Sequence, residues 1–171
     1  MQQKLHSSFF LRDVLSIAPR LLGKILVRKF EDGKIHRYKI TEVEAYRGTE
    51  DLACHASKGR TPRTEVMFGK GGVVYVYLIY GMYWMLNIVT GQENDASAIL
   101  IRGLEGASGP GRVGKVLQLD KTFYGENLSS SERIWIEDSG EKVQYKTSPR
   151  IGIQYAGEPW ISKPWRYFIS D

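Results

Sequence analysis

The sequence predicts an α+β fold: one domain, residues 1–171, with a mostly antiparallel, curved sheet and short helices around it. Segments that alternate, or that are rich in β-branched and aromatic residues, recur along the chain between short turn signals. Helix-like segments are few and short. No internal repeat, low-complexity tract or linker divides the 171 residues, and that length matches about one domain.

The first helix and the first hairpin are expected near the N-terminus. Ser16 is placed to cap a short helix over residues 16–22, just before a glycine. Residues 25–30 alternate as a strand, residues 31–33 (Glu-Asp-Gly) give a turn signal, and residues 34–46 predict the returning strand.

A long polar loop separates this hairpin from the next one. Residues 47–72 are irregular, and loops of that length are often functional. Residues 73–79 and 83–90 predict two strands, interrupted by Tyr80-Gly81-Met82, where glycine allows a sharp turn. Further along, we expect a strand at 96–102, a helix within 109–119, and strands at 134–137, 150–153 and 165–169.

Composition restricts the class of protein. Hydrophobic residues make up 42% of the chain and charged residues 25%, as in soluble globular proteins. There is no apolar run of membrane-spanning length and no apolar signal core in residues 1–8, so we expect a cytoplasmic protein. The single cysteine, Cys54, excludes an internal disulfide and a cysteine-based zinc cluster. The three histidines are scattered, so we do not expect a histidine metal site either.

The charge favours a polyanionic partner. The net charge is +5, and residues 1–80 contain 14 lysines and arginines against 8 acidic residues. A basic face of this kind favours nucleic acid, although an ordinary solvated surface gives the same count. The residues placed to contact phosphates are Lys58, Arg60, Arg63, Lys70, Arg102 and Arg112.

Two acidic residues stand out at the end of the second predicted strand. Alternation puts Glu42, Glu44 and Tyr46 on one face, where a general base and an aromatic platform can sit together. Periodicity does not separate the two glutamates, and a solvated strand edge would show the same pattern. His55 lies in the following loop, where it is either a pocket hydrogen-bonding group or a surface residue.

Five aromatic residues fall within residues 75–84. Tyr80 lies at the strand end beside a glycine, where a large side chain can wedge into a base stack. Tyr77 can hold a splayed base, and Asn87 on the next strand can read a base edge. We interpret Tyr75 and Tyr83 as packing residues.

The motifs also occur in a specific order. They are Glu-Ala-Tyr (44–46), Ala-Cys-His-Ala (53–56), Thr-Pro-Arg-Thr-Glu-Val-Met-Phe (61–68), Tyr-Val-Tyr-Leu-Ile-Tyr-Gly-Met-Tyr (75–83) and Leu-Asn-Ile-Val (86–89). In this order they closely resemble the alkyladenine (3-methyladenine) DNA glycosylase family. The resemblance extends from Phe9 to Phe168.

The resemblance implies a base-excision-repair enzyme. Such an enzyme flips alkylated or deaminated purines (3-methyladenine, 7-methylguanine, hypoxanthine, ethenoadenine) out of duplex DNA and hydrolyses the N-glycosidic bond, leaving an abasic site. Its partner is double-stranded DNA that contains damaged purines, and we expect a monomer without an obligate protein partner. No lysine lies in the matched pocket motifs, so we expect hydrolysis without a Schiff-base lyase step. The implied chemistry needs neither a metal nor an organic cofactor.

The resemblance also implies residue roles. Glu44 is expected to be the general base that activates water, and Arg102 to hold the DNA backbone near the flipped nucleotide. Tyr46, His55 and Tyr77 are expected to line the base pocket, with Asn87 crowding the exocyclic amino group of normal guanine. Tyr80 is expected to fill the vacated space in the duplex, flanked by Met82.

One departure and two alternatives accompany this reading. Between Glu105 and Gly109 the family usually has a longer segment, so DNA contacts from that region are in doubt. A non-catalytic nucleic-acid-binding module that stacks bases on aromatic residues would keep the tyrosines but would not require Glu44. A hydrolase of free nucleosides would need no wedge at Tyr80 and little positive charge.

Overall fold

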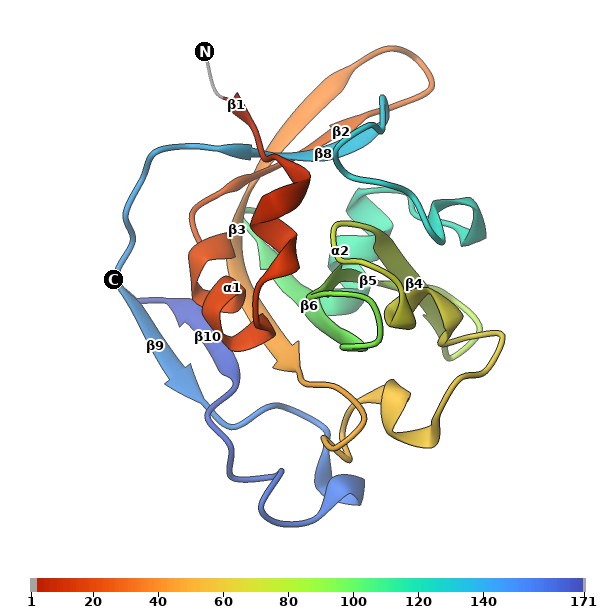
Figure 1. The fold of residues 1–171 in the computed structure, drawn as a ribbon. Coiled ribbons are helices and arrows are strands. Elements are labelled where there is room, and N and C mark those ends of the chain that lie inside the picture. Colours follow the sequence, from red (N-terminus) through yellow and green to blue (C-terminus); the bar gives the residue numbers. More distant parts are fainter. Residues whose placement is uncertain (1–2, 171) are drawn as a thin grey trace.

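The structure is a computed structural model that describes residues 3–170, and the predicted α+β class is confirmed (Figure 1). All of its strand pairs are antiparallel and join in one ten-stranded sheet of order β1-β8-β2-β3-β6-β5-β4, to which β10 adds at β3, β9 at β10 and β7 at β6. The strands are β1 (Gln3–Lys4), β2 (Ile25–Lys29), β3 (Ile35–Tyr46), β4 (Val74–Ile79), β5 (Tyr83–Thr90), β6 (Ser97–Leu104), β7 (Ala107–Ser108), β8 (Ile134–Asp138), β9 (Tyr145–Ser148) and β10 (Arg166–Ile169).

The helices are short. The two α-helices are α1 (Val14–Leu21) and α2 (Pro110–Val116), and the 3-10 turns are η1 (Ser7–Leu11), η2 (His55–Lys58), η3 (Glu65–Phe68), η4 (Lys121–Phe123) and η5 (Gln154–Ala156). No helix within residues 3–170 is both long enough and apolar enough to cross a membrane.

Strand β3 organises the sheet. Its first half pairs with β2, and its second half lies between β6 and β10. The register of β3 against β6 shifts on either side of Glu42. Glu42, Val43 and Glu44 have strand partners on both edges, on β6 and on β10, whereas Tyr46 pairs with β6 alone.

Helix α1 begins earlier than the sequence suggested. Asp13, not Ser16, is the N-cap: its carboxylate accepts a hydrogen bond of 2.8 Å from the Leu15 backbone N–H. Both residues are good capping types, and Ser16 instead lies in the first turn. Starting at Val14 places four apolar side chains on one stripe against the sheet, namely Val14, Ile17, Ala18 and Leu21.

Helix α2 packs closely on β5 because of one glycine. A Cβ atom at Gly114 would lie only 1.9 Å from the carbonyl oxygen of Trp84. Any side chain there would push the helix off the strand. This contact fixes α2, which carries Arg112, against the sheet.

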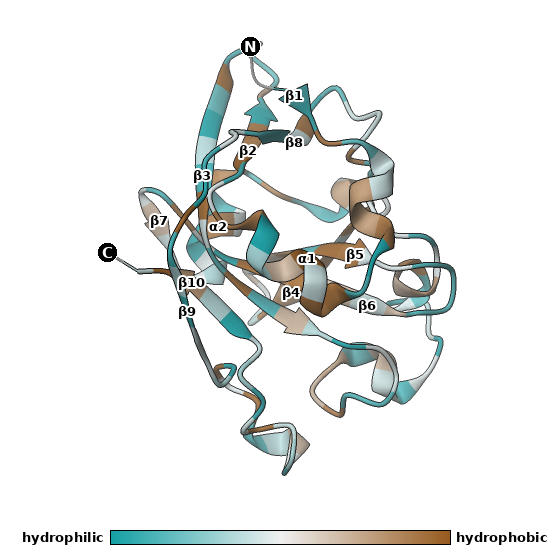
Figure 2. Cartoon of the chain, turned by 60° about the vertical axis from the view of Figure 1, so that its left-hand side comes forward, coloured by the Kyte–Doolittle hydropathy of each residue, from teal (hydrophilic) through white to brown (hydrophobic). Residues whose placement is uncertain are grey.

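Apolar residues gather in the centre of the molecule, on α1, β5 and β6 (Figure 2). A second, smaller cluster lies under the long loop between β3 and β4 and includes Cys54, Met67 and Tyr75. The loop is therefore anchored to the sheet by its own apolar side chains, next to the end of β3.

The prediction of a strand at residues 150–153 is wrong. The chain bends there, with a positive φ of 76° at Gly152, and then forms η5. Arg150 is buried and turned inward, and this interaction overrides the alternation of Ile151 and Ile153. The resulting loop lies beside the loop that follows β3 (Figure 1), and the Tyr155 hydroxyl donates to the Ala53 carbonyl oxygen over 2.9 Å.

Candidate active site

Glu44 is a fully buried carboxylate (0% exposed) near the end of β3. Its Oε1 accepts a hydrogen bond from the Tyr46 hydroxyl (2.9 Å) and lies 3.6 Å from a guanidinium nitrogen of Arg102. Its Oε2 accepts from the Ile151 backbone N–H at 2.7 Å. Every one of these partners is a donor, which suits a carboxylate that accepts on both oxygens. The group is held in one orientation from three sides.

Glu42 is on the same side of β3 but in a different environment. Its Oε2 accepts from Nε of Arg102 (2.9 Å) and from Nε of Arg166 (2.7 Å). Burial acts to raise the pKa of Glu42, but the hydrogen bonds from Arg166 and Arg102 outweigh it and lower the pKa. Glu42 thus anchors Arg102, whose other arm reaches Glu44.

A cluster of rings forms the wall beside Glu44. The ring centroids of His55 and Tyr77 are 4.6 Å apart in an edge-on arrangement, and those of Tyr75 and Tyr77 are 5.5 Å apart. Tyr46 comes from β3 and carries the hydrogen bond to Glu44. Tyr46 of β3 and Tyr77 of β4 pack against the same apolar cluster, and the ring of Tyr77 contacts His55 of η2. The expected pocket residues are thus brought together, although only Tyr46 and His55 line the cavity described next.

A small cavity of about 40 Å³ lies within this cluster. At roughly 10–15 Å³ per enclosed water, it holds a few waters and not a purine. It is lined by Tyr46, Ala53, Cys54, His55, Met67, Tyr75, Asn87, Ala98 and Tyr155. Tyr155, from η5, is 70% exposed and is the one lining residue that lies mainly in solvent. Burial raises the pKa of the Cys54 thiol to about 12, so this cysteine stays a thiol at neutral pH.

His55 is neutral at physiological pH. Burial, followed by the charge of Arg63, lowers the pKa of His55 from 6.5 to about 4. Its Nδ1 is 2.8 Å from the Tyr75 hydroxyl. Because burial raises the pKa of Tyr75, that hydroxyl stays protonated and can donate to Nδ1. His55 then carries its proton on Nε2 and remains a hydrogen-bond donor there.

Asn87 is 4% exposed and held by the backbone. Its Nδ2 donates to the Tyr75 carbonyl oxygen over 3.2 Å, and the side chain lines the cavity. The amide therefore presents a fixed surface to whatever enters the cavity.

The β4–β5 hairpin presents its tip to solvent. Tyr80 is 84% exposed and Met82 is 64% exposed. Tyr80 and Gly81 both have positive φ (53° and 65°), and the Met82 N–H donates to the Ile79 carbonyl oxygen, as in a type I′ turn. The strand register then pairs Ile79 with Tyr83, which leaves Met82 as one extra residue at the tip. A positive φ is unusual for a large side chain, so the turn holds Tyr80 outward at a conformational cost.

The four arginines expected to contact DNA differ in their surroundings. Arg63 lies over the Tyr77 ring, 4.9 Å from its centroid. Arg60 donates to Glu65 and Asn94, so its guanidinium is already engaged. Arg112 is exposed on α2, and Arg102 is held by the two glutamates of β3.

Sequence reasoning missed several residues of this site. Tyr75 was interpreted as packing; it is buried, yet its hydroxyl bonds to His55 and it lines the cavity. The backbone N–H of Ile151 reaches Glu44 across 107 residues of sequence, and no local pattern marks such a contact. Tyr155 lies just beyond the strand predicted at residues 150–153, and no motif or periodicity marks it.

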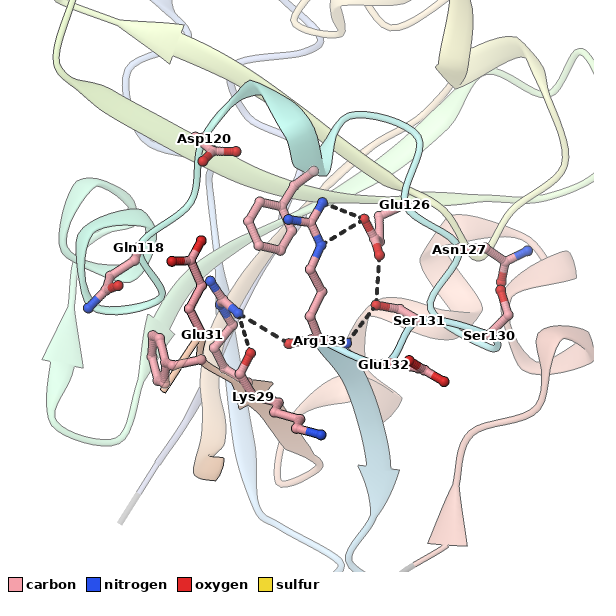
Figure 3. A pocket seen from close by; sticks show the side chains of 13 residues that line it. Lys29, Glu31, Gln118, Asp120, Glu126, Asn127, Ser130, Ser131, Glu132 and Arg133 are labelled. Atoms are coloured by element: carbon pink, nitrogen blue, oxygen red, sulfur yellow. Dashed lines mark hydrogen bonds and ion pairs between the residues drawn. The ribbon is translucent and has the colours of Figure 1, made fainter. Parts of the chain in front are cut away.

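A larger cavity, with a volume of about 710 Å³, lies elsewhere, between β2 and the residues that precede β8 (Figure 3). One set of its polar groups is already paired internally: Arg133 donates to Glu126, which also accepts from Ser131. This internal pairing leaves a structural network and not a reaction centre. Within residues 3–170, no three His, Cys, Asp or Glu side chains gather as a metal site requires.

The chain matches a known protein family over nearly its whole length. Residues 8–107 and 105–171 match the family model described as methylpurine-DNA glycosylase (MPG). The two matches meet at the shortened segment after Glu105. A protein from Legionella pneumophila strain Corby is 42% identical over 179 positions, which cover 99% of this chain and 96% of the relative. It is named "Putative 3-methyladenine DNA glycosylase".

Two further relatives carry the same name. One, from Psychrobacter cryohalolentis, is 40% identical over 195 positions, covering 96% of this chain and 91% of the relative. The other, from Methanocella arvoryzae, is 40% identical over 180 positions, covering 94% and 89%. The 195-position alignment exceeds the 171 residues of this chain, so that relative contains additional residues.

Proposed function

Because this chain belongs to the methylpurine-DNA glycosylase family and is a DNA glycosylase, we propose that it excises alkylated or deaminated purines from duplex DNA. The whole chain acts as one domain and as a monomer. Its substrates are 3-methyladenine, 7-methylguanine, hypoxanthine and ethenoadenine in double-stranded DNA, and its products are the free base and an abasic site.

The hairpin tip supports base flipping. A purine in the stack is out of reach of a buried carboxylate, so the nucleotide must turn out of the duplex. Tyr80, held outward by the turn, enters the space that the base leaves, and Met82 supports it. Arg63 and Arg112 supply positive charge for the phosphates, whereas Arg102 and Arg60 have to share or exchange their present partners to reach one.

The ring cluster supports recognition of the flipped base. Tyr46 on one side and His55 with Tyr77 on the other stack on the purine, and a cationic base stacks well on tyrosine. A neutral His55 adds no repulsive charge and donates from Nε2 to an acceptor of the base. The cavity must widen as the base enters, and Tyr155 is the exposed side chain at its edge.

Glu44 supports hydrolysis. An alkylated, positively charged purine is already a good leaving group, so the sugar carbon needs a positioned water and a base. Oε2 of Glu44 has a lone pair besides the one that accepts from Ile151, and it takes the proton of that water. The negative carboxylate also stabilises the oxocarbenium-like transition state. No lysine is among the described residues that line the cavity, which supports release without a lyase step.

The single observation that carries the proposal is the buried Glu44 carboxylate, fixed by two hydrogen bonds and an ion pair with Arg102 beside a cluster of aromatic rings. To test it, purified protein in EDTA is incubated with an end-labelled duplex containing one hypoxanthine and with methylated duplex DNA. We expect free base, and strand breaks at the lesion only after alkali, with both lost in Glu44→Gln. Base release that persists in Glu44→Gln contradicts the assigned role, and breaks before alkali contradict simple hydrolysis.

A further inference from the structure

A fully buried ion pair lies behind the candidate site. The Asp51 and Arg150 side chains are both 0% exposed, and two guanidinium nitrogens donate to the two carboxylate oxygens at 2.6 and 3.0 Å. Arg150 also donates to the Ala45 carbonyl oxygen at 3.0 Å. Asp51 in turn accepts from the backbone N–H groups of Arg47 and Ala53. The pair therefore ties the end of β3, the loop after it and the segment before η5 into one unit.

This unit contacts the reacting groups in two ways. Ile151 follows Arg150 directly, and its backbone N–H donates to Glu44 at 2.7 Å. The Arg150 guanidinium also lies against the Tyr46 ring, 4.9 Å from its centroid. Tyr46 donates its hydroxyl to the other oxygen of Glu44. Both oxygens of the carboxylate thus depend on the placement of Arg150.

Stability alone is a weak reason for such a pair. Burying two charges costs most of what their attraction returns, and well-packed apolar residues often serve as well. Nε of Arg150 is buried without a hydrogen-bond partner in the described structure, a further cost. Apolar residues would not supply a planar guanidinium group, whose two parallel hydrogen bonds fix the orientation of the chain at Ile151.

We propose that Asp51 and Arg150 are positioning residues for the excision reaction. Their ion pair holds the Ile151 N–H on Glu44 and supports the Tyr46 ring. Neither residue touches the base or the water, and both act through these two neighbours. The inference rests on the proposed role of Glu44 as the base.

The main test is Arg150→Lys. Lysine keeps the positive charge but presents a single ammonium, which does not reach both Asp51 oxygens and the Ala45 carbonyl together. We expect the single-turnover excision rate constant on the hypoxanthine duplex to fall on the order of 10²-fold, because small displacements of catalytic groups have effects of that size. The Kd for that duplex should change little, since the hairpin tip and the exposed arginines are untouched.

A pH profile separates positioning from folding. Losing the Ile151 N–H on Glu44 disfavours the ionised carboxylate, so the acidic limb of the pH–rate profile should move to higher pH. A purely structural role lowers the amount of active protein but leaves the single-turnover rate constant and its pH profile unchanged. Hydrogen exchange should also show faster exchange of the Ile151 amide in the variant.

Arg133→Lys is the matched control. Arg133 donates from two nitrogens to Oε2 of Glu126 and lies 3.8 Å from the Phe123 centroid, in the large cavity away from Glu44 (Figure 3). The Arg133→Lys substitution also replaces a guanidinium that donates from two nitrogens to a carboxylate and lies against an aromatic ring. Stability should fall, with no change in the single-turnover rate constant or its pH profile.

Asp51→Asn keeps the inference testable if Arg150→Lys does not fold. The substitution removes the charge but keeps one oxygen, which can still accept from one of the two backbone N–H groups. Circular dichroism monitors folding. The inference is overturned if either folded variant has the wild-type single-turnover rate constant and pH profile. It is also overturned if the rate constant falls together with DNA affinity while the pH profile stays unshifted. The wild-type and Glu44→Gln proteins are assayed on the same duplex. No base release by the wild type, or retained release by Glu44→Gln, would mean that the proposed function fails and not only this inference.

Discussion

The Tyr46 hydroxyl donates a 2.9 Å hydrogen bond to Oε1 of Glu44, two residues earlier on the same strand. Burial, together with the neighbouring Glu44 charge, raises the pKa of Tyr46 well above its usual value, so the hydroxyl stays a donor at any pH at which the enzyme works. The platform proposed to stack on the base is thereby joined to the carboxylate proposed to activate water. Strand alternation produces this pairing because residues two apart share a face.

Tyr46→Phe separates the two roles of this side chain. The variant keeps the ring for stacking but removes the donor to Glu44. We expect a single-turnover excision rate constant lower by roughly tenfold, which corresponds to about 1.4 kcal/mol for a hydrogen bond to a charged group. The affinity for a hypoxanthine duplex should stay nearly unchanged.

Tyr38→Phe provides the comparison for Tyr46→Phe, since it removes a hydroxyl from the same strand outside the candidate site. Its rate constant and affinity should match the wild type. If Tyr46→Phe weakens binding and leaves the rate alone, the hydrogen bond to Glu44 has no part in catalysis.

Much of the sheet could be predicted from local patterns. The bounds of β5 and the second strand of the first hairpin follow from alternation and from the turns at Gly33 and Gly81, because these signals are local. Glu44 and its aromatic neighbours could be selected only through the resemblance to a family. Periodicity alone leaves Glu42 and Glu44 equivalent, and the partners that distinguish them lie on other strands.

The rest depends on contacts between distant parts of the chain. Asp51 and Arg150 are 99 residues apart, and neither has a neighbouring motif that indicates a partner. Residues 150–153 show the alternation of a strand, but burial of the Arg150 guanidinium bends the chain instead. The role of Tyr75 was missed because a buried tyrosine on a strand has the same pattern whether or not its hydroxyl has a partner.

Asn87→Ser should relax discrimination against guanine. The Asn87 amide is fixed by its hydrogen bond to the Tyr75 carbonyl oxygen, so it occupies one place beside the cavity. A smaller side chain leaves room for the exocyclic amino group of guanine. Steric discrimination by a group of this size is worth roughly 10–200-fold. We therefore expect release of undamaged guanine, relative to hypoxanthine, to rise at least about tenfold, measured as the ratio of single-turnover rate constants.

Glu44→Gln in the Asn87→Ser background checks that any guanine release arises at this site. It should abolish release of both bases. An unchanged ratio in Asn87→Ser would mean that Asn87 does not discriminate by crowding.

Tyr80→Asn should raise the free energy of unfolding and lower the excision activity. Tyr80 adopts φ 53°, a conformation that costs a large L-residue roughly 1–2 kcal/mol, whereas Asn-Gly is the preferred type I′ turn. Little burial is lost, since the side chain is 84% exposed. We expect the free energy of unfolding to rise by about 1 kcal/mol, while excision from duplex DNA falls because the wedge is gone.

Gln118→Asn is the control for Tyr80→Asn. Gln118 also has a positive φ, 51°, and is exposed outside the candidate site. It should gain stability in urea unfolding without changing excision. Retained full activity in Tyr80→Asn would remove the wedge from the mechanism.

His55 makes folding stability depend on pH in a defined window. Burial and then Arg63 lower the pKa of His55 to about 4 in the folded protein, against 6.5 for an unperturbed histidine. Between these values the unfolded chain binds a proton that the folded protein does not, so stability falls as the pH is lowered from 6.5 towards 4.

The His55→Gln variant lacks this proton uptake. In urea unfolding, the difference in stability between wild type and variant should therefore shrink by on the order of 2 kcal/mol from pH 7.5 to pH 4. A difference that is independent of pH would show that His55 titrates normally, and the neutral imidazole invoked for stacking on a cationic base would then lose its support.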